Sequence, residues 1–116
     1  MIEYPYNMSL NKNVLIKALN RLMIFDKGEN SGCNVTFGEE YLSISNEFSP
    51  DNEEKIYYES GSTEIETPYY AKLNLNDFKV TLENCSEQFI VMSYGNNETI
   101  AITRNNILTI LPERHG

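Results

Sequence analysis

The sequence contains an internal repeat, and this repeat constrains the fold more than any other feature. Residues 10–13 (LNKN) recur as residues 73–76 (LNLN), 63 positions later. At the same spacing, three apolar residues have apolar counterparts: Leu15, Leu19 and Leu22 correspond to Phe78, Leu82 and Cys85. Similarity at a fixed distance is typical of duplicated structural units. We therefore expect two copies of one supersecondary unit.

Each copy contains one amphipathic helix. In residues 10–25, Leu15, Ala18, Leu19 and Leu22 are spaced i, i+3, i+4 and i+7, which places them on one side of a helix. Asn11 stands where a side-chain oxygen can accept from the unpaired N–H groups of the first turn. Residues 74–85 repeat this pattern with a shorter stripe, and Asn74 takes the capping position.

Alternating, β-rich segments follow each helix. In the first half, strands are predicted at 6–10, 33–37, 41–45 and 53–59, with a loop at 46–52 and a turn at 60–62. In the second half, an extended stretch at 64–73 precedes strands at 88–94, 99–104 and 107–111, the last two joined by a turn at 105–106. Residues 99–103 (TIAIT) repeat the pattern of residues 41–45 (YLSIS) at a spacing of 58.

These elements predict a single α+β domain over residues 1–116, with a duplicated β-α-β-β-β unit at 5–60 and 64–112. A chain of 116 residues is long enough for one hydrophobic core. Antiparallel hairpins with one helix per half place both helices on one side of the antiparallel sheet. The paired helices would then cover its apolar face.

The charges are segregated along the chain. The formal net charge is −8, and ten of the seventeen acids fall between Glu29 and Glu66. Six of the nine cations lie in or beside the two predicted helices. The acidic balance argues against binding nucleic acid through overall charge, but it is compatible with a local basic surface. The cations on the helices are either a solvated face or a surface for a polyanion.

No catalytic or metal-binding pattern is present in the sequence. There is no Cys/His pairing, no glycine-rich phosphate loop and no zinc or calcium motif. Cys33 and Cys85 are expected to be small buried residues. The N-terminus lacks the features of a signal peptide, and no apolar run is long enough to span a membrane. We expect a cytoplasmic protein without enzymatic activity, cofactor, metal or membrane partner.

The C-terminal residues 110–114 (ILPER) follow a predicted strand that Pro112 ends. This segment is either an unstructured tail or one wall of a groove for a partner peptide. Composition alone does not distinguish the two.

In order and spacing, these features resemble the third, C-terminal domain of a bacterial-type sliding clamp, the β processivity subunit of the replicative DNA polymerase. The matching segments are residues 8–22 (MSLNKNVLIKALNRL), 34–46 (NVTFGEEYLSISN), 52–65 (NEEKIYYESGSTEI) and 110–114 (ILPER). A full clamp chain of this family has three such domains. The chain would therefore be an excised domain, a single-domain relative that oligomerises, or a paralogue without ring function.

The resemblance implies a DNA-clamp fold in a ring that encloses double-stranded DNA, formed with other clamp domains or subunits. The residues that would face DNA are Lys12, Lys17, Arg21 and Lys79. Peptides of the DNA polymerase and the clamp loader would dock in a pocket to which this domain contributes Ile100, Leu111, Pro112, Glu113 and Arg114. Asp77 stands where the family often has an aromatic residue. The alternative is a clamp-fold protein-interaction module, an adaptor or clamp antagonist, that does not bind DNA.

Overall fold

The computed structural model describes residues 3–24, 31–61, 68–104 and 107–114. The first half contains β1 (Tyr6–Asn11), α1 (Lys12–Met23), β2 (Gly32–Phe37), β3 (Tyr41–Asn46), β4 (Ser49–Tyr57) and the short β5 (Ser60–Gly61). The second half contains β6 (Tyr69–Asn74), α2 (Leu75–Glu83), β7 (Phe89–Tyr94), β8 (Thr99–Arg104) and β9 (Ile107–Pro112). Apart from β5, the β-α-β-β-β order occurs twice, which confirms the predicted fold class.

The duplication extends to the detail of the elements. Strands β1 and β6 begin at Tyr6 and Tyr69, so they start 63 residues apart, and they bury the same alternate positions. Asn11 accepts from the Val14 amide at 3.1 Å, and Asn74 accepts from the Asp77 amide at 2.9 Å. Both helices are therefore capped as predicted, each by an asparagine at the end of a strand.

Several strand boundaries differ from the prediction. β4 begins at Ser49, inside the predicted loop, because Pro50 lies in an edge strand where its missing N–H breaks no ladder. Ser60 pairs with Ser9 of β1, so residues predicted to turn form a short strand. The last strand includes Pro112, which pairs with Thr99. The predicted turn at 105–106, and residues 64–67 of the predicted extended stretch, lie outside the described residues.

The two copies exchange their first strands. The sheets have the orders β5-β1-β7-β8-β9 and β4-β3-β2-β6, and neighbouring strands in both orders pair antiparallel. β1 of the first copy therefore pairs with β7 of the second, while β6 of the second pairs with β2 of the first. Each half completes its sheet only with a strand from the other half, so neither half forms this structure alone.

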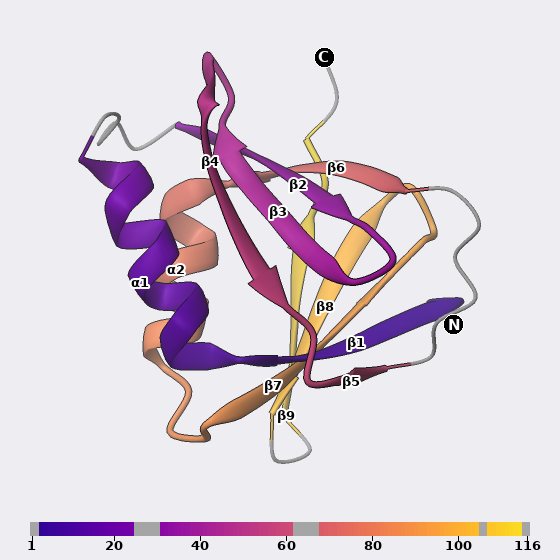
Figure 1. Cartoon of the computed structure of the whole chain (residues 1–116). Coiled ribbons are helices and arrows are strands. Elements are labelled where there is room, and N and C mark those ends of the chain that lie inside the picture. The colour runs from indigo at the N-terminus through magenta and orange to yellow at the C-terminus, as the bar shows by residue number, and fades with distance from the viewer. Residues whose placement is uncertain (1–2, 25–30, 62–67, 105–106, 115–116) are drawn as a thin grey trace.

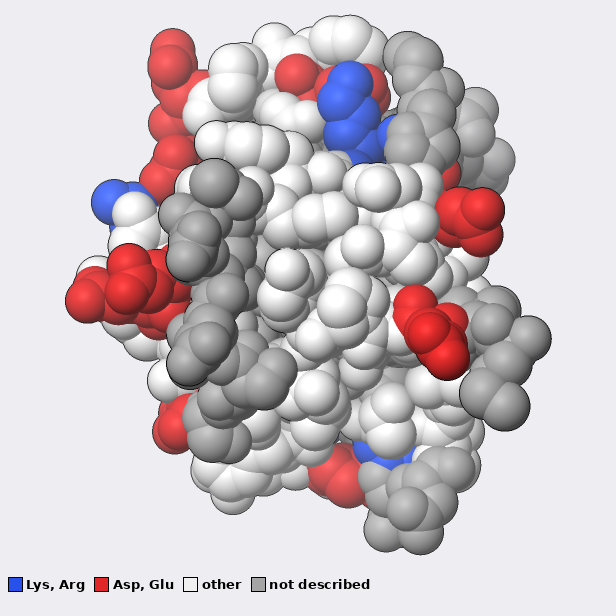
Figure 2. Space-filling model, turned by 90° about the vertical axis from the view of Figure 1, so that its right-hand side faces the viewer, with Lys and Arg blue, Asp and Glu red and all other residues white. Residues whose placement is uncertain are grey.

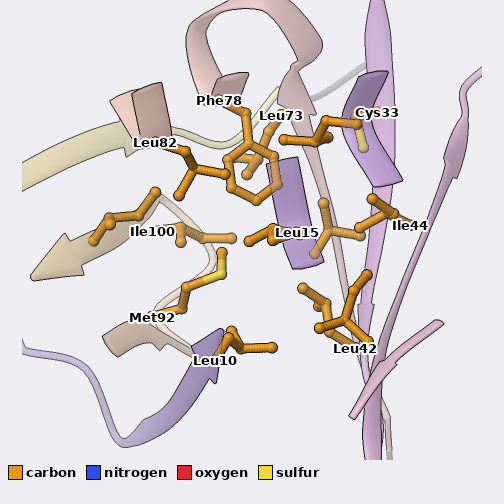
Figure 3. Close-up of a cluster of buried hydrophobic side chains, with 14 of the residues drawn as sticks. Leu10, Leu15, Cys33, Leu42, Ile44, Leu73, Phe78, Leu82, Met92 and Ile100 are labelled. Carbon is orange, nitrogen blue, oxygen red and sulfur yellow. The ribbon is translucent and has the colours of Figure 1, made fainter. Parts of the chain in front are cut away.

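The two helices lie side by side on one side of the sheets (Figure 1). Their apolar stripes face inward, where Leu15, Phe78 and Leu82 meet side chains from both sheets (Figure 3). Figure 3 shows Leu42 and Ile44 of one sheet opposite Met92 and Ile100 of the other. Burying each such side chain contributes about 1.5–3 kcal/mol relative to exposure. One core thus joins both copies.

Both cysteines are free and buried, as expected. Burial raises the pKa of the Cys33 thiol to about 12, so this group stays protonated at neutral pH. A protonated, enclosed thiol is a poor nucleophile and a poor metal ligand. Cys85 occupies the position of Leu22 in the repeat and is likewise part of the core.

A cluster of four aromatic rings joins the exchanged strands. Tyr6 pairs with Tyr94 across β1 and β7, and Phe37 pairs with Tyr69 at the equivalent place across β2 and β6. The rings of Phe37 and Tyr94 stack with centroids 3.7 Å apart, and Tyr6 and Tyr69 lie 5.5 and 5.4 Å from Tyr94. The cluster therefore stabilises the contact between the two sheets at the point where the exchanged strands begin.

Candidate functional site

The outer surface of the helix layer carries the first group of candidate residues. Lys17 and Arg21 lie on the exposed side of α1 because the apolar stripe occupies its inner side. Lys79 on α2 and Lys12 at the start of α1 are partly buried. The structure therefore brings the four cations to one layer, but with unequal access to a ligand.

Arg21 has a carboxylate partner on a neighbouring strand. Its Nε and Nη2 donate to Glu54 Oε1 of β4 at 3.0 and 2.7 Å. This hydrogen bond is the main reason that the pKa of Arg21 is raised. The side chains are 54% and 27% exposed, and ion pairs this accessible contribute little to stability. The effect of Glu54 is mainly to offset the positive charge of Arg21.

Lys12 makes a contact that was not predicted from the sequence. Its Nζ donates to the main-chain oxygen of Cys85 at 2.7 Å, just beyond the end of α2. Carbonyl groups at a helix C-terminus lack intrahelical partners and attract cations. Lys12 thus links the start of α1 to the end of α2. The attraction between a cation and a helix C-terminus is general, but the sequence did not indicate that the start of α1 lies beside the end of α2.

The helix layer is weakly positive within an acidic chain. Helices α1 and α2 carry four cations and two acids, Asp77 and Glu83, so their net charge is 4 − 2 = +2, against −8 for the whole chain. The layer also exposes Val14 and Val80, at 46% and 44%. The side of the molecule away from the helices has a broad uncharged centre, with acidic groups and a few basic groups around its margin (Figure 2).

The C-terminal candidates form a second group around strands β8 and β9. Ile100 and Leu111 are paired across these strands, and they are 0% and 7% exposed. Pro112 and Arg114 are exposed, whereas Glu113 is buried. The structure thus brings the five residues together. Ile100, Leu111 and Glu113 are buried, and Pro112 and Arg114 form the surface above them.

Strand β9 also exposes apolar side chains on the edge of its sheet. Ile107, Leu108 and Ile110 are 55%, 54% and 41% exposed, and β9 pairs only with β8 among the described strands. Solvent-facing edges with exposed apolar residues favour association with another chain or domain. The sequence carried a signal for this, because ILTIL does not alternate as a half-solvated strand would.

A partly buried hydrogen-bond network holds the C-terminal segment. Tyr69 Oη donates to Glu113 Oε2 at 2.8 Å and accepts from the Asn97 amide at 2.9 Å. The pKa of Tyr69 is raised to about 12, first by burial and second by the hydrogen bond to Glu113. The phenol therefore stays protonated at neutral pH and remains a donor. The amides of Glu113 and Arg114 donate to the main-chain oxygens of Glu98 and Lys72. Glu113 was predicted to line the peptide pocket, whereas no sequence feature pointed to Tyr69.

Tyr69→Phe is expected to loosen this segment. A hydrogen bond to a charged group contributes about 1.5–3 kcal/mol, so losing it should speed hydrogen exchange of the Arg114 amide by about tenfold or more. Native-state exchange followed by NMR measures this rate. Tyr70→Phe is the matched control, because the adjacent Tyr70 is 72% exposed. Equal exchange rates in the two variants would show that the Tyr69–Glu113 bond does not hold the segment.

Two findings bear on other site classes. No group of three or more His, Cys, Asp or Glu side chains within residues 3–24, 31–61, 68–104 and 107–114 is arranged to hold a metal ion. In the same residues, no helix is long and apolar enough to cross a membrane.

Comparison with known proteins gives a match in structure but not in sequence. No model of a known family and no curated protein sequence matches the chain. The structure of the DNA polymerase β subunit of Streptococcus pyogenes is similar to this chain, with a TM-score of 0.80 and 14% sequence identity. The match covers 100% of this chain and 33% of the β subunit. The β sliding clamp of C. crescentus is also similar, with a TM-score of 0.81 and 9% sequence identity. This match covers 100% of this chain and 31% of the clamp.

The Helicobacter pylori β clamp gives a similar result, with a TM-score of 0.75, 20% identity, and coverage of 93% of this chain and 29% of the clamp. The chain thus spans about a third of the length of the clamps that it matches. With its duplicated unit, exchanged strands and paired helices, the chain has the fold of one domain of a bacterial DNA polymerase sliding clamp.

Proposed function

We propose that this chain acts as a domain of a DNA sliding clamp, in a ring that encloses duplex DNA and keeps a polymerase on its template. The observation that carries the proposal is the helix layer, which has a net charge of +2 in a chain of −8 and belongs to a clamp-domain fold. In this role the protein is a non-enzymatic tether and needs no cofactor.

The contacts with DNA would be weak and independent of sequence. Lys17, Arg21 and Lys79 would face phosphates, with Glu54 moderating the charge of Arg21. Lys12 would contribute charge at a distance, because its ammonium group is bonded to Cys85. Phosphate contacts by flexible cations carry no base readout and fall with rising salt. Such contacts would allow the ring to slide while it remains topologically linked.

Assembly would use the edges of the sheets. A ring requires other clamp domains or subunits, and the exposed side chains of Ile107, Leu108 and Ile110 offer an apolar edge on β9. A domain contact that covers this edge would remove apolar surface from water and satisfy unpaired strand groups.

Polymerase and clamp-loader peptides would dock beside the C-terminal strand. Pro112 and Arg114 are exposed to contact a peptide, while Ile100 and Leu111 would form the buried support beneath them. Glu113 would hold the segment in place through Tyr69. Asp77, exposed in the first turn of α2, would favour peptides with a polar or basic residue at the neighbouring position.

The proposal is tested by retention on circular and linear DNA. The protein would be loaded by a clamp loader onto nicked circular DNA in moderate salt. We expect it to remain bound and to be released within minutes when a restriction enzyme linearises the circle, because topology rather than affinity holds a ring. Release at equal rates from both forms would exclude a DNA-encircling role.

A second candidate is a clamp-fold interaction module that does not bind DNA. The exposed Val14 and Val80, with Asp77 and Glu83 on the same layer, favour this role because such a surface also suits a protein partner. In the DNA-retention experiment, this module would not associate with either form of DNA but would co-purify with a clamp or polymerase.

A further inference from the structure

The outer face of the sheet β5-β1-β7-β8-β9 has no charged residue in the part of the chain that the structure describes. Alternate residues of a strand point to opposite faces, and residues paired across neighbouring strands point to the same face. Because the paired residues Met8 and Met92 point into the core, their neighbours in each strand lie on the outer face. The outer positions of these strands hold only Ser, Thr, Asn, Pro, Ala and larger apolar residues. In a chain with a net charge of −8 and 22% charged residues, such a face is unusual.

Part of this face is apolar and exposed to solvent. Phe89, Leu108 and Ile110 are 45%, 54% and 41% exposed. Val91 and Leu108 share one cross-strand row, and Phe89 and Ile110 are the next outer residues along β7 and β9. These four side chains are called the outer patch below. Exposed apolar residues that gather on one surface favour contact with another molecule.

A strand that paired with the edge of β9 would leave half of the outer patch exposed. β8 separates β7 from β9, and adjacent strands are about 4.8 Å apart, so Phe89 and Val91 lie about 10 Å inside the edge. A second sheet packed on this face would cover all four side chains, because stacked sheets interdigitate at about 10 Å. The outer patch therefore favours a partner that covers the face.

The distribution of charge favours a second copy of the chain as this partner. The sheet β4-β3-β2-β6 is acidic, and β4 alone contains Asp51, Glu53 and Glu54. The two sheets lie on opposite sides of the core (Figure 3), so the outer patch points away from these acids. Two copies that meet through the patch keep their acidic sheets far apart, which reduces the repulsion between two chains of charge −8. A partner recognised by charge would need charged groups on this face.

We propose that two copies of this chain associate through the outer patch, with their sheets packed face to face about a two-fold axis. Phe89, Val91, Leu108 and Ile110 form the apolar centre of the contact, and the surrounding hydroxyl and amide side chains form a polar rim. A six-residue strand is about 20 Å long and four strands span about 15 Å, so the contact is small. The dimer is therefore weak and depends on concentration. It does not rest on DNA binding, because the patch points away from the helix layer.

Sedimentation velocity of the chain from micromolar to millimolar concentration measures this association. We expect the sedimentation coefficient to rise with concentration toward that of a dimer. Added salt should strengthen the association, because it screens the repulsion between two acidic chains and the contact contains no ion pair. An association that weakens with salt would indicate charged contacts and would overturn the proposal.

Aspartate substitutions locate the contact. Phe89→Asp and Leu108→Asp should each raise the dissociation constant about tenfold or more, because a carboxylate loses its hydration in an apolar contact. Phe89 is two strands from the edge, so its effect distinguishes face packing from pairing at the edge of β9. Phe48→Asp is the matched control, since Phe48 is 83% exposed between β3 and β4 of the other sheet and should leave association unchanged. Amide NMR spectra verify that each variant is folded.

A mixture of isotope-labelled and unlabelled chains then identifies the side chains in contact. We expect intermolecular NOEs between the ring of Phe89 and the methyl groups of Val91, Leu108 and Ile110. Three further results would overturn the proposal. They are a monomer at every concentration, a Phe89→Asp variant that associates as tightly as the wild type, and intermolecular NOEs confined to other surfaces.

Discussion

Phe78→Ala is expected to lower the free energy of unfolding by about 3–5 kcal/mol. Phe78 is fully buried and points into the core between the helices and both sheets (Figure 3). Its removal costs the transfer free energy of the ring and leaves a cavity that rigid neighbours cannot fill. Because domains of this size are stable by only about 5–15 kcal/mol, the loss is a large share of the total.

Urea unfolding followed by circular dichroism measures this loss, with Leu15→Ala as a second test. Leu15 is the counterpart of Phe78 in the repeat and is also fully buried, so its replacement should cost about 2–5 kcal/mol. Phe48→Ala is the matched control. Phe48 is 83% exposed, and its loss should change the free energy by less than about 0.5 kcal/mol. Similar losses for Phe78 and Phe48 would contradict the assignment of the core.

Much of the fold could be predicted because its signals are local. The stripe from Leu15 to Leu22 follows from helix periodicity, and the caps at Asn11 and Asn74 depend on side chains three residues from their partners. The repeat then related the two halves, so that evidence for one helix supported the other. Strand boundaries were predicted less accurately. Pro50 is typical of a loop, yet a proline can also lie in an edge strand such as β4.

The strand exchange could not be predicted, because alternation defines which side of a strand is buried and not which strand lies beside it. β1 and β7 are separated by the whole of α1, β2 to β6 and α2. Either pairing, within a copy or between copies, buries Met8 and Leu10 in the same way. The choice is made by the packing of the complete domain, including the stacked rings of Phe37 and Tyr94.

The same limit applies to the candidate site. The cations of the helices could be identified from the sequence, but their partners could not. Arg21 and Glu54 are 33 residues apart in the chain, and Lys12 and Cys85 are 73 residues apart. The four residues carry the same charge, but they differ in their partners and in their access to a ligand. Lys12 is bonded to the main chain, Arg21 is offset by a carboxylate, and Lys17 is exposed. A test of DNA binding should therefore treat them separately.

Lys17→Glu combined with Lys79→Glu is expected to weaken equilibrium binding of the protein to a short linear duplex at low salt by about tenfold or more, whereas topology would still hold a loaded ring on circular DNA. Each phosphate contact contributes about −0.9 to the slope of log affinity against log salt, so losing two should make the slope shallower by about 2. Measuring the dissociation constant for the linear duplex across a series of salt concentrations gives this slope. A slope equal to that of the wild type would exclude both lysines from contact with phosphate.

Glu54→Gln should have the opposite effect, because it removes the carboxylate that competes with phosphate for Arg21. One additional phosphate contact would steepen the slope by about 1 and slow sliding through stronger binding. Glu53→Gln is the matched control, since Glu53 is the neighbouring acid on β4 and its ion partner is Lys55 rather than Arg21. If both variants steepen the slope equally, the general loss of acidic charge explains the effect. A steeper slope in Glu54→Gln alone assigns it to Arg21, and a wild-type slope in both would place Arg21 away from DNA.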